Sequence, residues 1–310
     1  MDREALSGRI ADLFVEWGAG ERDAVLGRIA GLVASCDDAE LEAFPTRLAT
    51  TGQTWGYHPY DPVGRRLSRL AHGLVLRPGS GLEPSDALAA ARQGPVFFIA
   101  NHLSYIDANV IDALLAGAGY ADVADGLTVL AGPKVFAKPI RRMASLCFGA
   151  IKMPQSQSTA SGEAVMPRRE VARLAQETLL TVEARRRAGD HLLVFVEGTR
   201  SRTGSMSRVL PAAARYFEAE GTQIVPLGLW GTEQLMRVET ETVTPSEVHA
   251  RAGRAIDAAK LFERAGGKRP VVADALGYLI ADLLPPAYRG EYASADVAPV
   301  ARAVASSFAA

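Results

Sequence analysis

The sequence predicts an α/β protein, in which a largely parallel sheet is flanked by helices and preceded by an N-terminal helical segment. From about residue 74, short apolar runs such as 96–100, 127–131 and 191–196 alternate with amphipathic stretches such as 107–118 and 168–187. Alternation of this kind is typical of parallel strands that are connected by helices. The chain has 310 residues, of which 48% are hydrophobic, and this is enough for one large core.

The first 50 residues predict helices. Apolar residues recur at helical spacing in residues 2–17 and 21–35, and a third helix is expected over 38–48. A helical cap on the main domain is the favoured interpretation, and a surface that touches a membrane or a carrier protein is the alternative. Residues 1–60 carry 5 basic against 10 acidic side chains, which argues against contact with anionic lipid.

Residues 50–64 are rich in Gly, Pro and aromatic residues, so we expect a structured loop or linker there. We therefore divide the chain into a helical region with its linker (1–73), a main domain (74–290) and a C-terminal tail (291–310). Arg65, Arg66 and Arg69 begin a short basic amphipathic helix, which is the better candidate for a membrane-facing element.

The main domain is expected to contain further elements besides those of the alternating pattern named above. They are helices over 83–92, 138–148 and 211–219, and strands over 150–153 and 223–230. In sheets of this kind, ligands bind at the carboxyl ends of the strands.

The charge distribution separates possible partners. The net charge is −1, so the chain as a whole is not a nucleic-acid binder. Residues 130–215, however, carry 15 basic against 6 acidic side chains. This local excess suits an anionic partner such as a phosphate, a coenzyme, an acidic carrier protein or a lipid headgroup.

The remaining composition points to a reducing compartment and no metal. The two cysteines have no CxxC spacing and give neither a disulfide framework nor a metal signature. The N-terminus lacks the apolar centre of a signal peptide, and no window approaches the roughly 20 apolar residues of a membrane span. We expect a cytoplasmic location, free or peripheral on the cytoplasmic membrane face.

Polar motifs follow three of the predicted strands. NHLSYID, residues 101–107, places His102 and Asp107 at a strand-to-helix junction, which suits a histidine base and the carboxylate that orients it. EGTRS, residues 197–201, combines a guanidinium with a glycine turn and hydroxyl groups, which suits an anion clamp. Gly231-Thr232-Glu233 is the third motif. Taken singly, each motif also fits a structural role.

Taken together, the motifs resemble those of the glycerophospholipid acyltransferases, of which lysophosphatidic acid (1-acylglycerol-3-phosphate) acyltransferase is the best-known member. The first block of that family is an Asn-His pair with an Asp after four more residues, here Asn101, His102 and Asp107. The third, Phe-x-Glu-Gly-Thr-Arg-Ser, corresponds to residues 195–201, and the fourth, an apolar strand around Val-Pro, to residues 224–227. The resemblance covers roughly residues 75–285.

The second block departs from the family pattern. It usually ends in an Arg that contacts substrate phosphate, and Gln155 occupies that position here. A smaller departure is Val196, where Pro is usual. The candidates to replace the missing Arg are all basic residues of the same region: Lys134, Lys138, Arg141, Arg142 and Lys152.

The resemblance implies an acyltransferase that moves an acyl group from an acyl thioester, of coenzyme A or acyl carrier protein, to a hydroxyl of a lysophospholipid. It implies His102 as general base and Asp107 as its orienting partner. The substrate-binding residues would be Glu197, Gly198, Thr199, Arg200 and Ser201, with Arg200 on a phosphate. It implies neither cofactor nor metal, a lipid acceptor, and peripheral contact with a membrane.

Three other functions stay open. The same chemistry can act on an amino-lipid, a sugar or a secondary metabolite, which Gln155 favours. A thioester hydrolase differs only in that water replaces the acceptor. A non-catalytic lipid- or carrier-binding homologue is the third, and the intact pair of His102 and Asp107 argues against it.

Overall fold

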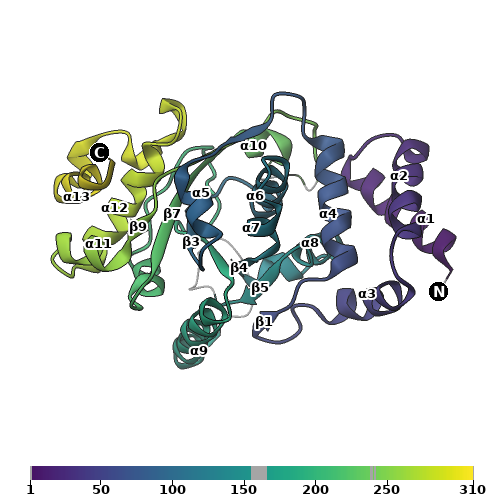
Figure 1. Ribbon diagram of the computed structural model, residues 1–310, viewed down its shortest axis with the longest axis horizontal. Coiled ribbons are helices and arrows are strands. Elements are labelled where there is room, and N and C mark those ends of the chain that lie inside the picture. Colours follow the sequence, from purple (N-terminus) through teal and green to yellow (C-terminus); the bar gives the residue numbers. More distant parts are fainter. Residues whose placement is uncertain (1, 155–165, 238–239, 241, 310) are drawn as a thin grey trace.

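The computed structural model of the chain describes residues 2–154, 166–237, 240 and 242–309, and a nine-stranded sheet forms its centre (Figure 1). The strands are β1 (Gly56–His58), β2 (Gly81–Glu83), β3 (Phe97–Ala100), β4 (Leu127–Ala131), β5 (Gly149–Lys152), β6 (His191–Phe195), β7 (Gln223–Trp230), β8 (His249–Ala252) and β9 (Ile256–Asp257). Their order is β1-β5-β4-β6-β3-β7-β8-β2, and β9 pairs with β7. Five of the eight pairs in the described residues are parallel, which confirms the predicted fold class.

Helices connect and cover these strands. The α-helices are α1 (Arg3–Trp17), α2 (Arg22–Ala34), α3 (Asp38–Thr50), α4 (Pro62–Val75), α5 (Asp86–Ala91), α6 (Asp107–Gly117), α7 (Ala121–Asp125), α8 (Pro139–Ser145), α9 (Arg168–Arg187), α10 (Thr232–Leu235), α11 (Ala258–Arg264), α12 (Arg269–Ala281) and α13 (Pro299–Ala309). The 3₁₀ segments are η1 (Pro133–Phe136), η2 (Pro211–Phe217), η3 (Pro286–Tyr288), η4 (Gly290–Tyr292) and η5 (Ala295–Val297).

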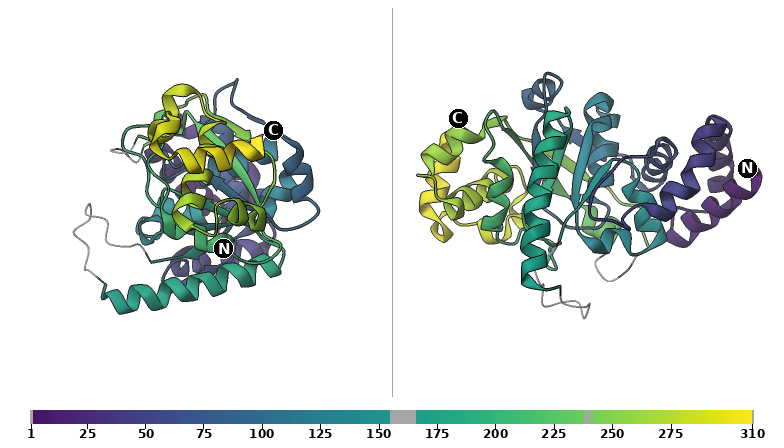
Figure 2. Two further views of the ribbon diagram at one scale, coloured as in Figure 1. Left: turned by 90° about the vertical axis from the view of Figure 1, so that its left-hand side faces the viewer. Right: turned by 90° about the horizontal axis from the view of Figure 1, so that it is seen from below.

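Strand β3 shows how the sheet separates two layers of helices. Its side chains point alternately to opposite faces. Phe98 and Ala100 join a core cluster that is built largely from α1 to α8, whereas Phe97 and Ile99 join a second cluster with α9, η2, α11, α12 and α13. All four are buried, as expected for a central parallel strand. Figure 2 shows α9 lying across the molecule as a long, straight helix.

The N-terminal helices pack on the main body at the end opposite α11 to α13 (Figure 1). Helix α1 begins where Asp2 accepts hydrogen bonds from the backbone of the first turn, and it ends at Gly18, whose φ of 104° favours glycine. The apolar residues Phe14 and Trp17 of α1 are buried. The backbone oxygen of Trp17 also accepts from the N–H of Val243 at 2.7 Å. These contacts agree with a helical cap.

The arginines of α4 bind groups of the protein itself and not a free surface, so the expectation that they face a membrane is wrong. The Nε of Arg65 donates to the oxygen of Cys147 at 2.8 Å, and Arg69 pairs with the buried Asp112 at 2.9 Å. Arg66 pairs with Glu40 of α3. Carboxylates and carbonyls that are distant in the sequence therefore satisfy the charges that the local pattern assigned to a surface.

Two predicted helices take another form. The segment expected as a helix over 83–92 begins with the edge strand β2, which pairs in parallel with β8, and α5 starts only at Asp86. The helix expected over 211–219 is the 3₁₀ segment η2, with Pro211 in its first turn. The predicted strands over 96–100, 127–131, 150–153, 191–196 and 223–230 agree with β3, β4, β5, β6 and β7 to within one residue.

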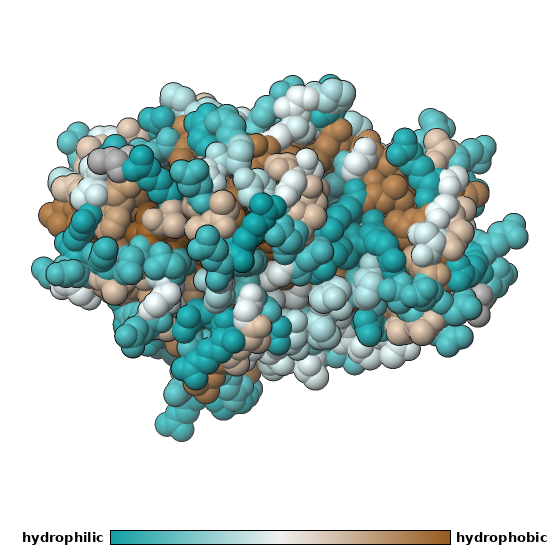
Figure 3. Space-filling view, viewed as in Figure 1, coloured by the Kyte–Doolittle hydropathy of each residue, from teal (hydrophilic) through white to brown (hydrophobic). Residues whose placement is uncertain are grey.

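The surface carries hydrophobic residues in separated areas among hydrophilic ones, on the face that Figure 3 shows. Within the described residues, no helix is long and apolar enough to span a membrane. Cys36 and Cys147 are both buried and unpaired, as expected of small apolar residues. Helix α13 packs against α12. The division of the chain at residues 73 and 290 stays a prediction.

Candidate active site

The ends of three strands bring the sequence motifs together at one edge of the sheet. β3 lies between β6 and β7, and its last residue, Ala100, is opposite Phe195 of β6. The histidine motif (Asn101–Asp107) therefore starts beside the glutamate motif (Glu197–Ser201). The parallel arrangement of these strands, which the alternating sequence predicts, is what makes the two motifs neighbours.

Asn101 fixes the histidine motif to strand β7. Its Nδ2 donates to the oxygen of Leu229 and its Oδ1 accepts from the N–H of the same residue, both at 2.8 Å. The third motif lies at the same edge of the sheet, but its residues do not line the cavity described below. Glu233 accepts from the N–H of Gly231 at 3.1 Å and from the hydroxyl of Tyr288 at 2.7 Å. The three predicted motifs are thus close together, but only the first two line the cavity.

His102 and Asp107 form a hydrogen-bonded pair. The Nδ1 of His102 lies 2.8 Å from Oδ2 of Asp107, and this oxygen also accepts from the backbone N–H of Leu103 and Ser104 at 2.6 and 2.9 Å. Because a carboxylate oxygen accepts, Nδ1 carries the hydrogen and Nε2 of the neutral ring holds the lone pair. Asp107 is fully buried in the first turn of α6, where the helix dipole favours its negative charge.

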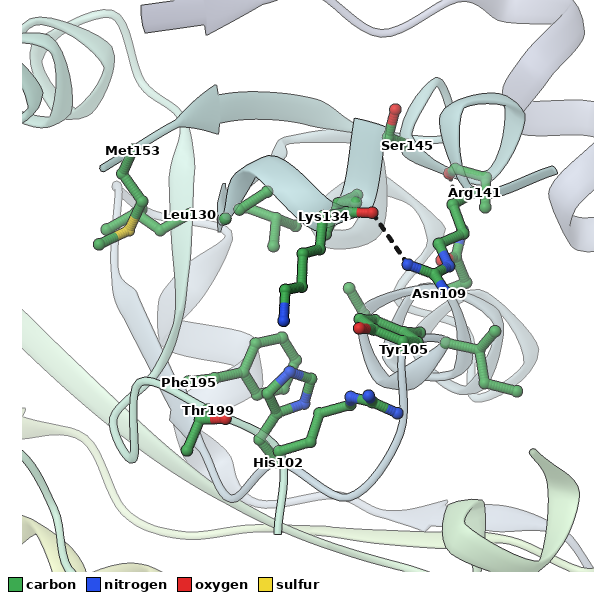
Figure 4. A pocket seen from close by; sticks show the side chains of 18 of the residues that line it. His102, Tyr105, Asn109, Leu130, Lys134, Arg141, Ser145, Met153, Phe195 and Thr199 are labelled. Atoms are coloured by element: carbon green, nitrogen blue, oxygen red, sulfur yellow. Dashed lines mark hydrogen bonds between the residues drawn. The ribbon is translucent and has the colours of Figure 1, made fainter. Parts of the chain in front are cut away.

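The ring of His102 stacks on the ring of Phe195, with centroids 4.2 Å apart and planes 18° from parallel. The side chain of His102 is 18% exposed, whereas that of its partner Asp107 is not exposed at all. This difference leaves the imidazole accessible from the cavity while its orienting carboxylate stays out of water. Figure 4 shows the two stacked rings at the cavity wall, with the side chain of Thr199 beside them.

Glu197 joins the backbones of two loops. One carboxylate oxygen accepts from the N–H of His102 at 2.8 Å and the other from the N–H of Ser207 at 2.6 Å. Burial raises the pKa of Glu197 to about 7, although these two hydrogen bonds act in the opposite direction. A buried carboxylate with both oxygens occupied by backbone donors holds the loops in place.

Gly198 makes the turn between these loops possible. Its φ of 70° is in the left-handed region, and a Cβ there would come within 2.3 Å of a side-chain carbon of Leu210. After this turn the N–H of Ser201 donates to the backbone oxygen of His102 at 2.7 Å. Ser201 is buried within the loop, where its hydroxyl lies 3.3 Å from that of Thr203. It does not line the cavity.

Two guanidinium groups lie against the ring of Tyr105. The central carbon of Arg200 is 3.4 Å from the ring centroid and that of Arg141 is 3.9 Å from it. Burial lowers the pKa of Arg200, and its Nη1 has no hydrogen-bond partner among the described residues. Both guanidinium groups therefore line the cavity and make cation–π contacts with the same aromatic ring.

All of these groups surround a cavity of about 890 Å³. Its basic side chains, Lys134, Arg141, Arg200 and Arg202, are half-buried or exposed and mark its charged part. In Figure 4 the ammonium group of Lys134 points from the opposite wall toward the rings of His102 and Phe195. A cavity of this size accommodates a ligand much larger than a small metabolite.

The apolar wall of the cavity has two unlike parts. The closed side consists of buried residues from α1, α4, α8 and the turn after α8: Phe14, Trp17, Ala71, Met143 and Phe148. The open side consists of half-buried or exposed residues from the segments around α9 and η2: Met153, Val171, Ala175, Leu210 and Tyr216. The closed side belongs to the first core cluster, whereas Met153 and Tyr216 pack on the second, across the sheet.

The structure separates the five candidates for the missing Arg. Lys134 and Arg141 line the cavity. Lys152 instead donates to the oxygen of Gly52 at 2.6 Å, and Arg142 to the oxygen of Ala49 at 3.3 Å. Lys138 does not line the cavity, and Gln155, aligned with the family Arg, lies outside the described residues.

Sequence reasoning missed Tyr105 and the closed side. Tyr105 lies inside the histidine motif, so its position next to His102 was a usable signal. Phe14 and Trp17 carried no signal beyond amphipathic spacing, because their place in the cavity depends on long-range packing. In the described part of the chain, no group of three or more His, Cys, Asp and Glu side chains could hold a metal ion.

Comparison with known proteins gives the class. Residues 83–230 match the model of a family described as Acyltransferase. Residues 83–230 therefore carry an acyltransferase domain, as the motifs predict. No curated protein matches the sequence. Among solved structures it is similar to the 1-acyl-sn-glycerophosphate (LPA) acyltransferase PlsC from Thermotoga maritima, with 17% identity, a TM-score of 0.44, and coverage of 91% of this chain and 97% of that one.

Proposed function

We propose that this acyltransferase moves an acyl group from a thioester, of coenzyme A or acyl carrier protein, to a hydroxyl of a lysophospholipid such as 1-acylglycerol-3-phosphate. The observation that carries the proposal is the pair of His102 and Asp107 at the wall of a cavity with both basic and apolar parts. A lipid that bears a phosphate presents the same two kinds of surface.

In this proposal His102 is the general base. Its Nε2 takes the proton from the acceptor hydroxyl while the oxygen attacks the thioester carbonyl, so that a C–O bond forms and a tetrahedral oxyanion develops. When the oxyanion collapses, the C–S bond breaks, and the imidazolium gives the proton that came from the acceptor hydroxyl to the leaving thiolate, which departs as a thiol. Asp107 holds the ring in the required tautomer and stabilises its cation. A base of this kind contributes on the order of 10²–10⁴ in rate.

In this mechanism the basic residues stabilise two negative charges, the developing oxyanion and the phosphate of the acceptor. Lys134 points toward His102 from across the cavity, and we assign its ammonium group to the developing oxyanion. We assign the phosphate of the acceptor to Arg200, with Arg141 and Arg202 beside it. Thr199 and Gly198 lie next to that position on the exposed turn, where their polar groups can contact the same substrate.

A second acceptor class is supported by one observation, the Gln at position 155. Because the family uses an Arg there for substrate phosphate, its replacement favours an acceptor without a glycerol phosphate, such as an amino-lipid, a sugar or a secondary metabolite. The chemistry at His102 would be unchanged. Lys134 and Arg141 favour the phosphate-bearing acceptor, because they supply cations from other positions of the same cavity wall.

We also propose that the protein works at the cytoplasmic face of a membrane, since its proposed acceptor resides there. The proposed location depends on the identity of the acceptor, so the experiment that identifies the acceptor also tests the location.

Removal of the base tests the mechanism. We expect His102→Ala to reduce the turnover number by about 10²–10⁴ while the protein stays folded. The control is His249→Ala, because His249 stacks on Trp230 outside the cavity and its loss should leave turnover unchanged. Circular dichroism and thermal unfolding verify that both variants fold. Activity of His102→Ala within about tenfold of the wild type would refute its role as the base.

The acceptor is tested by thiol release from one acyl thioester, with and without lysophosphatidic acid, and by mass spectrometry of the products with a panel of acceptors. Release that needs lysophosphatidic acid supports the proposed acceptor. Release without any acceptor indicates a hydrolase, and an acylated product with another compound identifies the second class. No release with any acceptor would contradict an enzymatic role.

A further inference from the structure

A short segment near the C-terminus braces the loop that follows the glutamate motif. We call residues 288–292 the brace; they lie outside the segment, 83–230, that matches the acyltransferase family. The supported loop comprises residues 201–209. The two are more than seventy residues apart in the chain, so their contact depends on the tertiary fold.

Three hydrogen bonds join the brace to this loop. The N–H of Met206 donates to the oxygen of Tyr288 at 2.9 Å, and the oxygen of Met206 accepts from the N–H of Glu291 at 3.0 Å. The N–H of Val209 donates to the hydroxyl of Tyr292 at 2.9 Å. Met206, Val209 and Tyr292 are all buried, so loss of these bonds leaves polar groups that water does not readily reach.

The approach of the brace is too close for any side chain at position 290. Gly290 has a φ of 48°, and a Cβ there would lie 2.0 Å from the oxygen of Met206 and 2.8 Å from its carbonyl carbon and its nitrogen. These are backbone atoms, which cannot rotate away as the end of a side chain can. Glycine at this position therefore allows the brace to lie directly on the loop.

Residues 201–209 are connected to the proposed base, His102, through the carboxylate of Glu197. Ser207, which follows Met206, donates its N–H to one oxygen of Glu197 at 2.6 Å. The other oxygen accepts from the N–H of His102 at 2.8 Å. The buried carboxylate has a backbone donor on each oxygen, so the position of Ser207 and the position of His102 depend on each other.

The brace also reaches the third motif. The hydroxyl of Tyr288 donates to Glu233 at 2.7 Å, and Glu233 accepts from the N–H of Gly231 after strand β7. The brace therefore joins the loops that follow β6 and β7, on either side of the β3 end that carries His102.

We propose that Gly290 and Tyr292 are positioning residues for the acyl transfer, acting through Ser207 and Glu197 on the backbone of His102. This inference rests on the function proposed above, because it assigns the brace to the same base. Gly290, Tyr292 and Ser207 do not line the cavity, so their effect on the reaction is indirect. A displacement of about 1 Å in a reacting group can cost up to 10²-fold in rate.

The central experiment compares two buried tyrosines. Tyr292→Phe removes the hydroxyl that accepts from Val209 and donates to Asp274 at 3.0 Å. The matched control is Tyr278→Phe, whose hydroxyl likewise makes two hydrogen bonds, here both with the backbone: it donates to the oxygen of Ser294 at 2.8 Å and accepts from the N–H of Ala298 at 3.2 Å. The rings of the two tyrosines touch, with centroids 5.0 Å apart. We expect similar losses of thermal stability in both variants.

Only Tyr292→Phe should then lower the turnover number, by roughly tenfold, with little change in the Michaelis constants, since the substrates do not contact the brace. In the Glu197→Gln background, which lacks one of the two acceptors, adding Tyr292→Phe should change the turnover number little further. Equal turnover in Tyr292→Phe and Tyr278→Phe, or fully additive losses with Glu197→Gln, would overturn the inference.

A second pair of variants tests the close approach. Gly290→Ala introduces a Cβ against Met206, whereas Gly266→Ala, at a φ of 62° with no atom within 4 Å of its Cβ position, introduces the same backbone strain in open space. Hydrogen–deuterium exchange of peptides that cover 101–107 and 201–209 should increase in Gly290→Ala and Tyr292→Phe, and not in Gly266→Ala or Tyr278→Phe.

The hydrogen–deuterium exchange measurement does not depend on activity. It therefore distinguishes a failure of the proposed function from a failure of the inference about the brace. A wild-type protein that releases no thiol with any acceptor removes the proposed function, and the exchange data still decide whether the brace holds residues 101–107. An active wild type with unchanged exchange in Gly290→Ala and Tyr292→Phe removes the inference alone.

Discussion

The closed and open sides of the cavity differ in their relation to water. Phe14, Trp17 and Ala71 on the closed side are at most 7% exposed, whereas Leu210 on the open side is 44% exposed. A chain on the closed side has fixed atoms around it, and each methylene group that finds no room there loses its burial. A chain on the open side can extend toward the surface. We therefore expect the closed side to limit the length of a chain that binds there and the open side to tolerate variation in length.

His102 and the basic residues line the same cavity as the closed and open sides. This lining fits a reaction between two lipids, because each hydrocarbon chain requires apolar surface near the reacting groups. We propose that the donor chain binds at the closed side and the acceptor chain at the open side.

Filling the closed side should have the largest effect. Ala71→Phe adds a ring where Ala71 lines the cavity, so a long donor chain loses the burial of three or four methylene groups, about 0.8 kcal/mol each, or about 100-fold in kcat/KM. A short-chain thioester in the same variant is the internal control, because it does not reach the added ring. Equal losses for short and long chains would show that the closed side does not hold the donor.

Removing the guanidinium of Arg200 should affect the binding of the acceptor alone. Arg200→Ala is expected to raise the Michaelis constant of a phosphate-bearing acceptor by roughly tenfold, as for the loss of one charge-assisted hydrogen bond, without altering the preference for donor chain length. Arg215→Ala is the control, since Arg215 is exposed on η2 and lies outside the cavity wall. If the constants of both substrates stay at their wild-type values, Arg200 does not bind the phosphate.

The smallest expected effect concerns pH and the burial of the closed side. Burial lowers the pKa of His72, which lies beside Trp17. Below the unfolded value of about 6.5 the unfolded chain therefore binds the proton more readily than the folded one, and the free energy of unfolding falls as the pH falls. One such group contributes at most about 1.4 kcal/mol per pH unit.

His72→Gln should reduce this loss of stability between pH 7 and pH 5, measured by denaturant unfolding at a series of pH values. An identical slope in His72→Gln and the wild type would mean that water reaches the closed side freely.

The sequence predicted those elements that local patterns determine. The helix expected over 168–187 is α9, with identical bounds, because its apolar positions and flanking residues are all local. Strand β2 was missed because its three residues gain a hydrogen-bonded partner only in β8, 168 positions further along the chain. The inward direction of Arg65 and Arg69 was missed for the same reason, since their partners Cys147 and Asp112 belong to other helices and loops.

The candidate site divides in the same way. The pairing of His102 with Asp107 could be predicted, because both residues belong to one strand-to-helix turn. The contact between Glu197 and the backbone of His102 required the register of β3 against β6, which a pattern of alternating elements does not specify. The contacts of Arg141 and Arg200 with the ring of Tyr105 could not be predicted either, because the three residues come from separate segments of the chain.

The hydrogen bond from Val243 to Trp17 has a consequence for the order in which the chain folds. Trp17 leaves the ribosome early, but the residue that fixes its backbone is made more than two hundred residues later. Contacts of such sequence separation form late and slowly. Until then the apolar faces of α1 and of the growing sheet remain uncovered, and a nascent chain in this state is exposed to aggregation. Closure of the substrate cavity is therefore a late step in the biosynthesis of this protein.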